Sequence, residues 1–149
     1  MSASGEKTRA LIEKFIEHNQ AGRFEECYRM LNPDARYTLI GKTRASGTYI
    51  GPDDVFARLA PLLSNFTERP RMQFSHILVD GNQAFLRASG EGCGLYGRYE
   101  QPFYGFYFRV ENGGFAEMIE YLDPLQLEIS LFGKELVDAK AGKASLRAT

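Results

Sequence analysis

Two opposite charges interrupt a stretch of small and apolar residues at positions 83–91. Arg87 and Glu91 share the same parity of position there, every second residue, with Phe85 and Ser89. Because successive side chains of a β-strand point to opposite faces of a sheet, these four residues are expected on one face. On an inward face the two charges would form a buried pair or a polar rim, and Arg87 could stabilise an oxyanion. On an outward face both would simply be solvated.

Glu120 and His76 are the candidate proton carriers. Glu120 shares its parity with the apolar Met118 and Leu122. A carboxyl group on an apolar face has its pKa raised by desolvation, which suits a general acid or base. His76 shares its parity with Met72, and an imidazole titrates near neutrality. The alternatives are an ion-paired surface glutamate and a hydrogen-bonded core histidine.

The chain is rich in aromatic residues, with 11 Phe, 8 Tyr and no Trp, and they gather after residue 95. They could cover both faces of a wide sheet, or they could line a pocket for a ring-containing ligand. Tyrosines at a cavity edge would supply phenol donors. The candidate catalytic residues are Tyr37, His76, Arg87, Glu91 and Glu120. The candidate substrate contacts are Tyr49, Phe56, Tyr99, Tyr104, Phe106 and Leu122.

The elements that must position these residues follow from periodicity and turn signals. Helical spacing predicts helices from a cap at Ser4 to residue 20, over 23–31, and over 52–66, where Pro61 should kink or split the helix. Alternation predicts short strands at 36–40 and 48–50. It also predicts two long hairpins, with strands at 72–80 and 83–91 and at 103–111 and 115–122. A short helix at 125–132 ends the predicted structure.

The hairpin turns at 80–82 and 112–114 are too short for parallel crossovers, so an antiparallel sheet is expected. The predicted fold class is α+β: a cone-shaped, curved antiparallel sheet wrapped around three N-terminal helices. One domain over residues 1–149 accounts for the chain, with its core at about 5–133 and a tail at 134–149.

Composition restricts the partners. With 18 Lys and Arg against 19 Asp and Glu, the net charge of −1 gives no general attraction to nucleic acid or to an anionic membrane. The N-terminus has no apolar signal core, and Cys27 and Cys93 allow at most one disulfide. A cytoplasmic protein with free thiols is the simplest expectation. The sequence has no phosphate-binding glycine loop, no zinc spacing and no nucleophile elbow, so neither cofactor nor metal is expected.

Four short segments, at residues 15–24, 32–37, 47–51 and 117–123, resemble the nuclear transport factor 2-like superfamily, especially its SnoaL-like and ketosteroid-isomerase-like enzymes. The resemblance covers about residues 5–133. It implies a curved sheet that closes over a helix to leave a pocket, and it implies a homodimer.

The resemblance also implies where catalytic groups would lie. Ketosteroid isomerases use a carboxylate base with an oxyanion hole of a tyrosine and a protonated aspartate, a case that is well described. The corresponding positions here are near Leu39, at Phe15 and near Phe106, so all three groups are missing. Steroid isomerisation by that mechanism is therefore not expected.

Two other relatives are compared in the same way. Limonene-epoxide hydrolases use a carboxylate–arginine–carboxylate set with a water-holding tyrosine and asparagine. Arg87 and Glu120 correspond to the arginine and one carboxylate, and Tyr37 corresponds to the tyrosine. Ser89 and Leu39 depart from the second carboxylate and the asparagine. Diarylpropane lyases, which act on lignin-derived aromatic dimers, are similar in chemistry but not in a diagnostic motif.

The expectation from these comparisons is a cofactor-independent lyase or isomerase for a small hydrophobic, aromatic molecule, such as a diarylpropane-type dimer. The alternatives are an epoxide-hydrolase-like enzyme and a non-catalytic binding or scaffold module.

Overall fold

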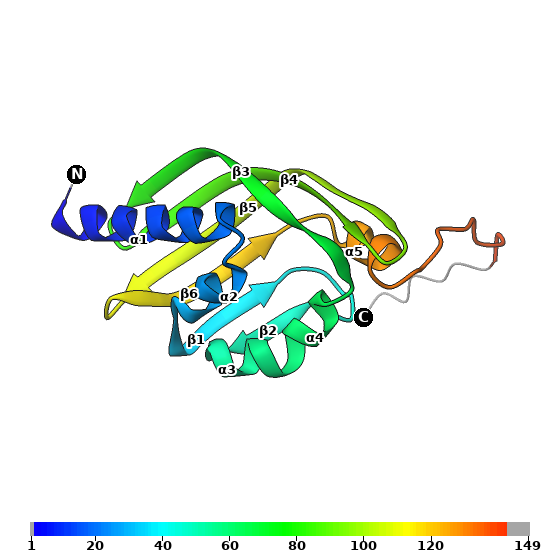
Figure 1. The fold of residues 1–149 in the computed structure, drawn as a ribbon, viewed down its shortest axis with the longest axis horizontal. Helices are drawn as coiled ribbons and strands as arrows, with labels where there is room; N and C mark the ends of the chain where they lie inside the picture. Colours follow the sequence, from blue (N-terminus) through cyan, green and yellow to red (C-terminus); the bar gives the residue numbers. More distant parts are fainter. Residues whose placement is uncertain (1, 143–149) are drawn as a thin grey trace.

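The computed structural model describes residues 2–142 and contains one curved six-stranded sheet with helices on its concave side and at its ends (Figure 1). The strands are β1 (Leu31–Leu39), β2 (Gly47–Ile50), β3 (Phe66–Asp80), β4 (Gln83–Gly94), β5 (Gly97–Glu111) and β6 (Gly114–Tyr121). The helices are α1 (Ala3–Gln20), α2 (Phe24–Arg29), α3 (Gly51–Asp54), the π-helical turn η1 (Val55–Leu59), α4 (Ala60–Leu63) and α5 (Pro124–Ser130). The α+β prediction is confirmed.

The strand order is β2-β1-β6-β5-β4-β3. Neighbouring strands are antiparallel except for β1 and β6, which run parallel. The expected sheet had no parallel pair. The long connection from β1 through β2, the helices and both hairpins gives the chain enough length to return beside β1 in the same direction.

The N-terminal helix begins slightly earlier than expected. Its cap is Ser2, whose Oγ accepts a hydrogen bond from the backbone N–H of Gly5 at 3.0 Å, so Ser4 lies inside the helix. Gly22, with a φ of 76°, lets the chain turn after α1. The next helix is shorter than predicted, because β1 already begins at Leu31.

The helical segment between β2 and β3 is irregular at the expected place. Pro61 lacks an N–H, and its ring clashes with the carbonyl four residues before it. The α-helical ladder therefore widens into the π-helical turn η1 just ahead of it, so the α-helix is interrupted near Pro61. The helix ends at Leu63, so Phe66, predicted to be helical, instead begins β3.

Two hairpins form the wide part of the sheet, with their turns at the predicted positions. Gly81, at a φ of 59°, joins β3 to β4, and Asn112 and Gly113, at 51° and 76°, join β5 to β6. Consecutive positive φ values match the right-handed twist of the flanking strands. The strand β5 starts at Gly97, ahead of the expected residue 103.

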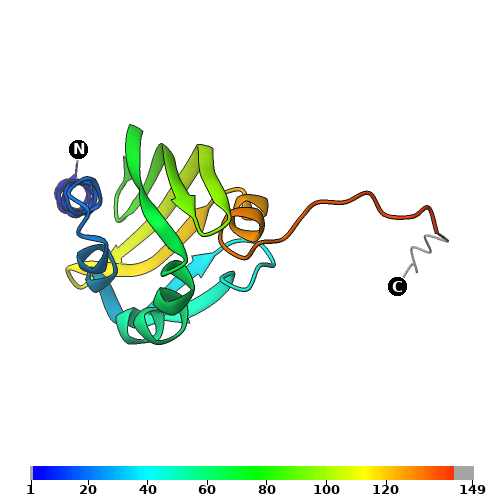
Figure 2. The ribbon, with the colours of Figure 1, turned by 45° about the vertical axis from the view of Figure 1, so that its right-hand side comes forward.

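Helix α1 packs along the inner face of the hairpins (Figure 2). On β4 that face carries Ala84, Leu86 and Ala88, each no more than 4% exposed. The ring of Phe15 meets the edge of the Phe106 ring, with centroids 5.4 Å apart. These small side chains of β4 leave room for the aromatic residues of α1 and β5. Ala84, Leu86 and Ala88 therefore face the helix, and Arg87 lies on the opposite face of β4.

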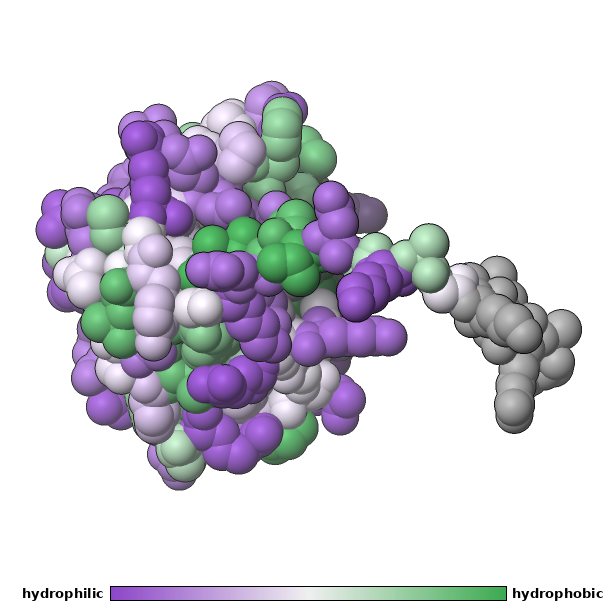
Figure 3. Space-filling model, turned by 90° about the vertical axis from the view of Figure 1, so that its right-hand side faces the viewer, coloured by the Kyte–Doolittle hydropathy of each residue, from purple (hydrophilic) through white to green (hydrophobic). Residues whose placement is uncertain are grey.

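Residues 133–142 extend away from the body without regular structure (Figures 1 and 2). Apolar side chains gather on the face of the body from which this segment leaves (Figure 3). The exposed apolar residues of the chain include Leu95 in the β4–β5 turn and Leu125 in α5. Residues 143–149 of the predicted tail lie outside the described part. Cys27 and Cys93 are free thiols. Among the described helices, none combines the length and the apolar character that a membrane crossing requires.

Candidate functional site

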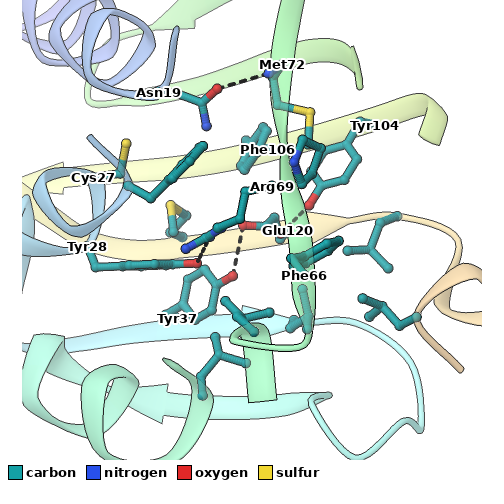
Figure 4. A pocket seen from close by; sticks show the side chains of 18 of the residues that line it. Asn19, Cys27, Tyr28, Tyr37, Phe66, Arg69, Met72, Tyr104, Phe106 and Glu120 are labelled. Atoms are coloured by element: carbon teal, nitrogen blue, oxygen red, sulfur yellow. Dashed lines mark hydrogen bonds between the residues drawn. The ribbon is translucent and has the colours of Figure 1, made fainter. Parts of the chain in front are cut away.

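A cavity of about 60 Å³ lies between the inner face of the sheet, the helices α1 and α2, and the start of β3 (Figure 4). Its wall is mostly apolar, and the strands that contribute to it are β1, β3, β5 and β6. A few polar side chains converge on it, namely Asn19, Cys27, Tyr28, Tyr37, Arg69, Tyr99, Tyr104 and Glu120. An apolar wall with a few convergent polar groups is typical of small-molecule sites.

Glu120 lies at the centre of this polar group. It comes from β6, between Tyr37 on β1 and Tyr104 on β5, and both tyrosines donate hydrogen bonds to its carboxylate (Figure 4). Tyr37 Oη lies 2.8 Å from Glu120 Oε1, and Tyr104 Oη contacts Glu120 Oε2. The strand order β1-β6-β5 produces this arrangement, because it places the glutamate strand between the two tyrosine strands.

Burial dominates the electrostatics of the carboxyl group. Desolvation raises the pKa of Glu120 above the usual value, although the hydrogen bonds from Tyr104 and Tyr37 and the charge of Arg69 partly oppose this. Burial and the neighbouring carboxylate raise the pKa of Tyr37 and of Tyr104 well above the usual value. The tyrosines therefore stay neutral donors, and Glu120 is the group that can carry a proton.

Arg69, from β3, brings a positive charge to the same cavity. Its guanidinium lies over the ring of Phe24, 4.3 Å from the centroid, and its Nη2 donates to Tyr28 Oη at 3.5 Å. Its Nε is buried without a hydrogen-bond partner among the described residues. Burial raises the pKa of Tyr28 to about 12, with Arg69 acting in the opposite direction.

Sequence reasoning missed both Arg69 and Tyr28. Arg69 precedes Pro70, and this stretch was expected to be the connection between a helix and a strand. In the structure β3 already includes it. An arginine beside a proline at the start of an alternating run was the only available signal.

The remaining polar residues of the cavity are held by the scaffold. Asn19 Oδ1 accepts from the backbone N–H of Met72 at 3.1 Å, which ties α1 to β3. Tyr99 Oη accepts from Gln101 Nε2 at 3.0 Å. Burial raises the pKa of the Cys27 thiol to about 12, so it is not a ready nucleophile.

The structure corrects the placement of three candidate catalytic residues. Arg87 is exposed on the outer face of the sheet, with its guanidinium 5.7 Å from the ring centroid of Phe103. Glu91 is exposed on the same face and pairs with Arg98 at 3.1 Å. The expectation that Arg87 and Glu120 share a chamber is therefore wrong, because the small residues of β4 face the helix instead.

His76 is also outside the cavity, for a different reason. Met72 and Phe74 point inward as expected, but a bulge interrupts the pairing of β3 with β4 between Phe74 and His76. The extra residue, Ser75, inverts the parity after it. His76 is consequently exposed on the outer face, where its Nδ1 lies 3.0 Å from Ser75 Oγ.

Four of the six candidate substrate contacts line the cavity, namely Tyr99, Tyr104, Phe106 and Leu122. Tyr49 does not line it: its hydroxyl donates to the carbonyl of Ala45 at 2.7 Å, and its ring lies behind that of Tyr37. Phe56 also lies one layer out, with its ring edge-on to Tyr28.

The three positions at which the resemblance puts the catalytic groups of ketosteroid isomerases, Phe15, Leu39 and Phe106, all line the cavity. Leu39 and Phe106 are the register partners of Glu120 on the two neighbouring strands. The site therefore occupies the expected chamber but has a different set of polar groups.

No protein-family model matches the chain, and no curated protein sequence does. Solved structures do match. An NTF2-like protein of unknown function from Burkholderia pseudomallei is similar with a TM-score of 0.73 at 16% identity, over 88% of this chain and 98% of that one. A candidate SnoaL-like polyketide cyclase from Jannaschia sp. gives 0.71 at 14% identity, over 91% and 98%. A candidate ketosteroid isomerase from Kribbella flavida gives 0.58 at 17% identity, over 97% and 90%.

These likenesses show the fold. The chain has the nuclear transport factor 2-like fold, as the sequence resemblance predicts.

Proposed function

We propose that the protein is a cofactor-independent acid–base enzyme of the isomerase, cyclase or lyase type, acting on a small, mainly apolar and aromatic molecule. One observation carries the proposal: the Glu120 carboxyl lies in an apolar cavity with each oxygen bound by a tyrosine, Tyr37 on one side and Tyr104 on the other. Such surroundings raise the pKa of the carboxyl and fix its direction, as general acid–base catalysis requires.

The chemistry that fits this site is proton transfer at carbon. As a carboxylate, Glu120 would take a proton from a carbon next to a substrate carbonyl. The electrons of the C–H bond would move into the carbonyl to form an enolate, and the proton on Glu120 would return to another carbon. A carboxylate has about four acceptor positions. The two tyrosines occupy two of them and leave room for the substrate proton.

Two solved neighbours support an enzyme of this kind. The Jannaschia protein is named as a candidate SnoaL-like polyketide cyclase and the Kribbella protein as a candidate ketosteroid isomerase. They support the class of reaction and leave the substrate open.

Cavity size limits the substrate. An engineered cavity that binds benzene measures about 150 Å³, against about 60 Å³ here. A single ring therefore requires some movement of lining side chains, and a diarylpropane-type dimer requires more. We propose compact aromatic substrates first, with the two-ring class as the upper limit.

The alternatives have less support from the site. The epoxide-hydrolase alternative retains Tyr37 and Glu120 in the cavity. It also requires Arg87 to point into the cavity, whereas Arg87 is exposed outside it. A non-catalytic module would not require an acid and hydrogen-bond donors that converge on one cavity.

The test is deuterium exchange at the carbon next to the carbonyl of acetone and acetophenone, followed by NMR. Glu120→Gln should slow protein-catalysed exchange by at least ~10²-fold. The matched control is Glu91→Gln, which neutralises an exposed carboxylate on the same sheet and should match wild type. A wild-type rate no higher than that of Glu120→Gln on every ketone tried would refute the proposal.

The homodimer and the cytoplasmic location implied above stay predictions. Sedimentation equilibrium measures the first directly, and a mass of one chain, 16.8 kDa, at micromolar concentration would contradict it.

A further inference from the structure

Arg69 is a partly buried cation that lines an apolar cavity, and within the described part of the chain its donors make a single hydrogen bond. A guanidinium has five N–H donors. Nη2 only reaches Tyr28 Oη at the long distance of 3.5 Å, and the buried Nε has no partner among the described residues. A buried donor without a partner costs free energy, more so on a charged group. This arrangement becomes favourable when something in the cavity accepts those hydrogen bonds.

The carboxylate of Glu120 does not do so. It lines the same cavity, yet no Arg69–Glu120 ion pair within 4.0 Å exists. Its oxygens are instead bound by Tyr37 and Tyr104. The negative group thus has its own neutral donors, and the positive group is left facing the cavity.

We propose that Arg69 and Tyr28 form an anion-binding subsite, so that the molecule bound in the cavity carries a carboxylate, enolate or phenolate oxygen next to its apolar part. The inference rests on the proposed function only for the claim that this molecule is also the substrate. It narrows the substrate class from small, mainly apolar aromatic molecules to aromatic or enolisable acids.

The surroundings of the guanidinium suit this role. The Phe24 ring under it fixes the plane of the fork by a cation–π contact. The Tyr28 hydroxyl, whose pKa of about 12 keeps it protonated, supplies a further donor beside it. A planar fork with an adjacent hydroxyl matches the two oxygens of a carboxylate.

The binding experiment compares acids with their neutral amides. Acetate and acetamide are small enough for the present cavity, and benzoate and benzamide probe the aromatic class. Affinities are measured by NMR titration of wild type, Arg69→Met and Glu120→Gln. The matched control is Arg71→Met, which removes an exposed arginine from the same strand.

In Glu120→Gln, where the competing negative charge is gone, we expect the acid of at least one pair to bind at least ~10-fold tighter than its amide, because hydrogen bonds to charged groups are stronger than those between neutral groups. Wild type should show the same preference, though smaller, and so should Arg71→Met. Arg69→Met should lose the preference while still binding the amide, which shows that the cavity is intact. Should Arg69→Met not fold, Tyr28→Phe in the Glu120→Gln background must still reduce the preference.

Equal affinity for acid and amide in both wild type and Glu120→Gln would overturn the proposal and leave Arg69 as a counter-charge for Glu120 only. A preference for the acids retained in Arg69→Met would overturn it as well. The sodium salt of 4-nitrophenol distinguishes a phenolate or enolate site from a strict carboxylate site. Because these measurements record binding, they remain informative if Glu120 proves not to catalyse proton exchange. Conversely, exchange could be Glu120-dependent without any preference for anions.

Discussion

Tyr37 Oη donates to Glu120 Oε1 across 2.8 Å and links β1 to β6, the two strands that run parallel in this sheet. The contact joins residues 83 positions apart in the chain. It gives the central carboxyl group a fixed orientation, and with the bond from Tyr104 it offsets part of the desolvation that raises the pKa of Glu120.

Removing that hydrogen bond should raise the pKa of Glu120 further. In Tyr37→Phe the carboxylate loses a donor, so the acid limb of the pH–rate profile for ketone exchange should move to higher pH. The maximal rate should fall by roughly tenfold as orientation is lost. Tyr49→Phe is the control, because its hydroxyl donates to the Ala45 carbonyl and not to the carboxylate. Identical profiles for wild type and Tyr37→Phe would contradict this role.

The raised pKa of Glu120 makes stability depend on pH in a defined direction. The folded state binds the proton of Glu120 more tightly than the unfolded state does, so its contribution is fully present below the unfolded pKa. That contribution is lost as pH rises through the folded pKa. Glu120→Gln should therefore have a higher Tm than wild type near neutral pH, and the difference should shrink as pH falls toward the ordinary range of a glutamate.

Thermal unfolding of both proteins across pH 4–8 measures this effect, and Glu91→Gln, at an exposed ion pair, should show no such trend. A Glu120→Gln variant that is less stable than wild type at pH 8 and equal to it at pH 4 would reverse the sign and refute the argument.

Enlarging the cavity should admit larger ligands. Leu63 lines the cavity and is 8% exposed, so Leu63→Ala should cost about 2–3 kcal/mol of unfolding free energy and add space. Diphenylmethane should then bind at least several-fold tighter than to wild type, as measured by fluorescence competition. Leu86→Ala, on the inner face but outside the lining, should lose similar stability with no gain in binding.

The two thiols should differ in reactivity. Burial raises the pKa of Cys27 to about 12, and its Sγ donates to the Phe15 carbonyl at 3.7 Å. Iodoacetamide at pH 8 should therefore label Cys93, which is partly exposed, and leave Cys27 unlabelled, as read by peptide mass spectrometry. Denatured protein should label at both. Rapid native labelling of Cys27 would show that the cavity opens to solvent.

The sequence predicted the fold better than it predicted the site, for reasons that particular residues illustrate. Glu120 was placed correctly because its neighbours of equal parity, Met118 and Leu122, are buried in the structure. Arg87 was wrongly predicted to face the cavity, because β4 has apolar residues on both of its faces. The periodicity of the sequence predicts that side chains alternate between the two faces, but it does not indicate which face is buried.

Two further features depend on tertiary structure. The bulge at Ser75 inverts the parity of His76, and nothing in the local sequence marks it. Arg69 enters the cavity because β3 begins several residues before the alternating pattern becomes clear. Its neighbour in the site, Tyr28, comes from a helix 41 residues earlier, so only the folded chain brings the two together.

The most direct test of a proton-carrying carboxyl in the cavity is the pKa of Glu120 itself. It can be measured by ¹³C NMR titration of carboxyl-labelled glutamate, with the resonance assigned from its loss in Glu120→Gln. We expect this pKa to lie above that of every exposed glutamate in the same spectrum, and to rise further in Tyr37→Phe. A Glu120 that titrates with or below the exposed glutamates would contradict the account, because an easily ionised, well-solvated carboxylate would not be the buried acid–base group described here.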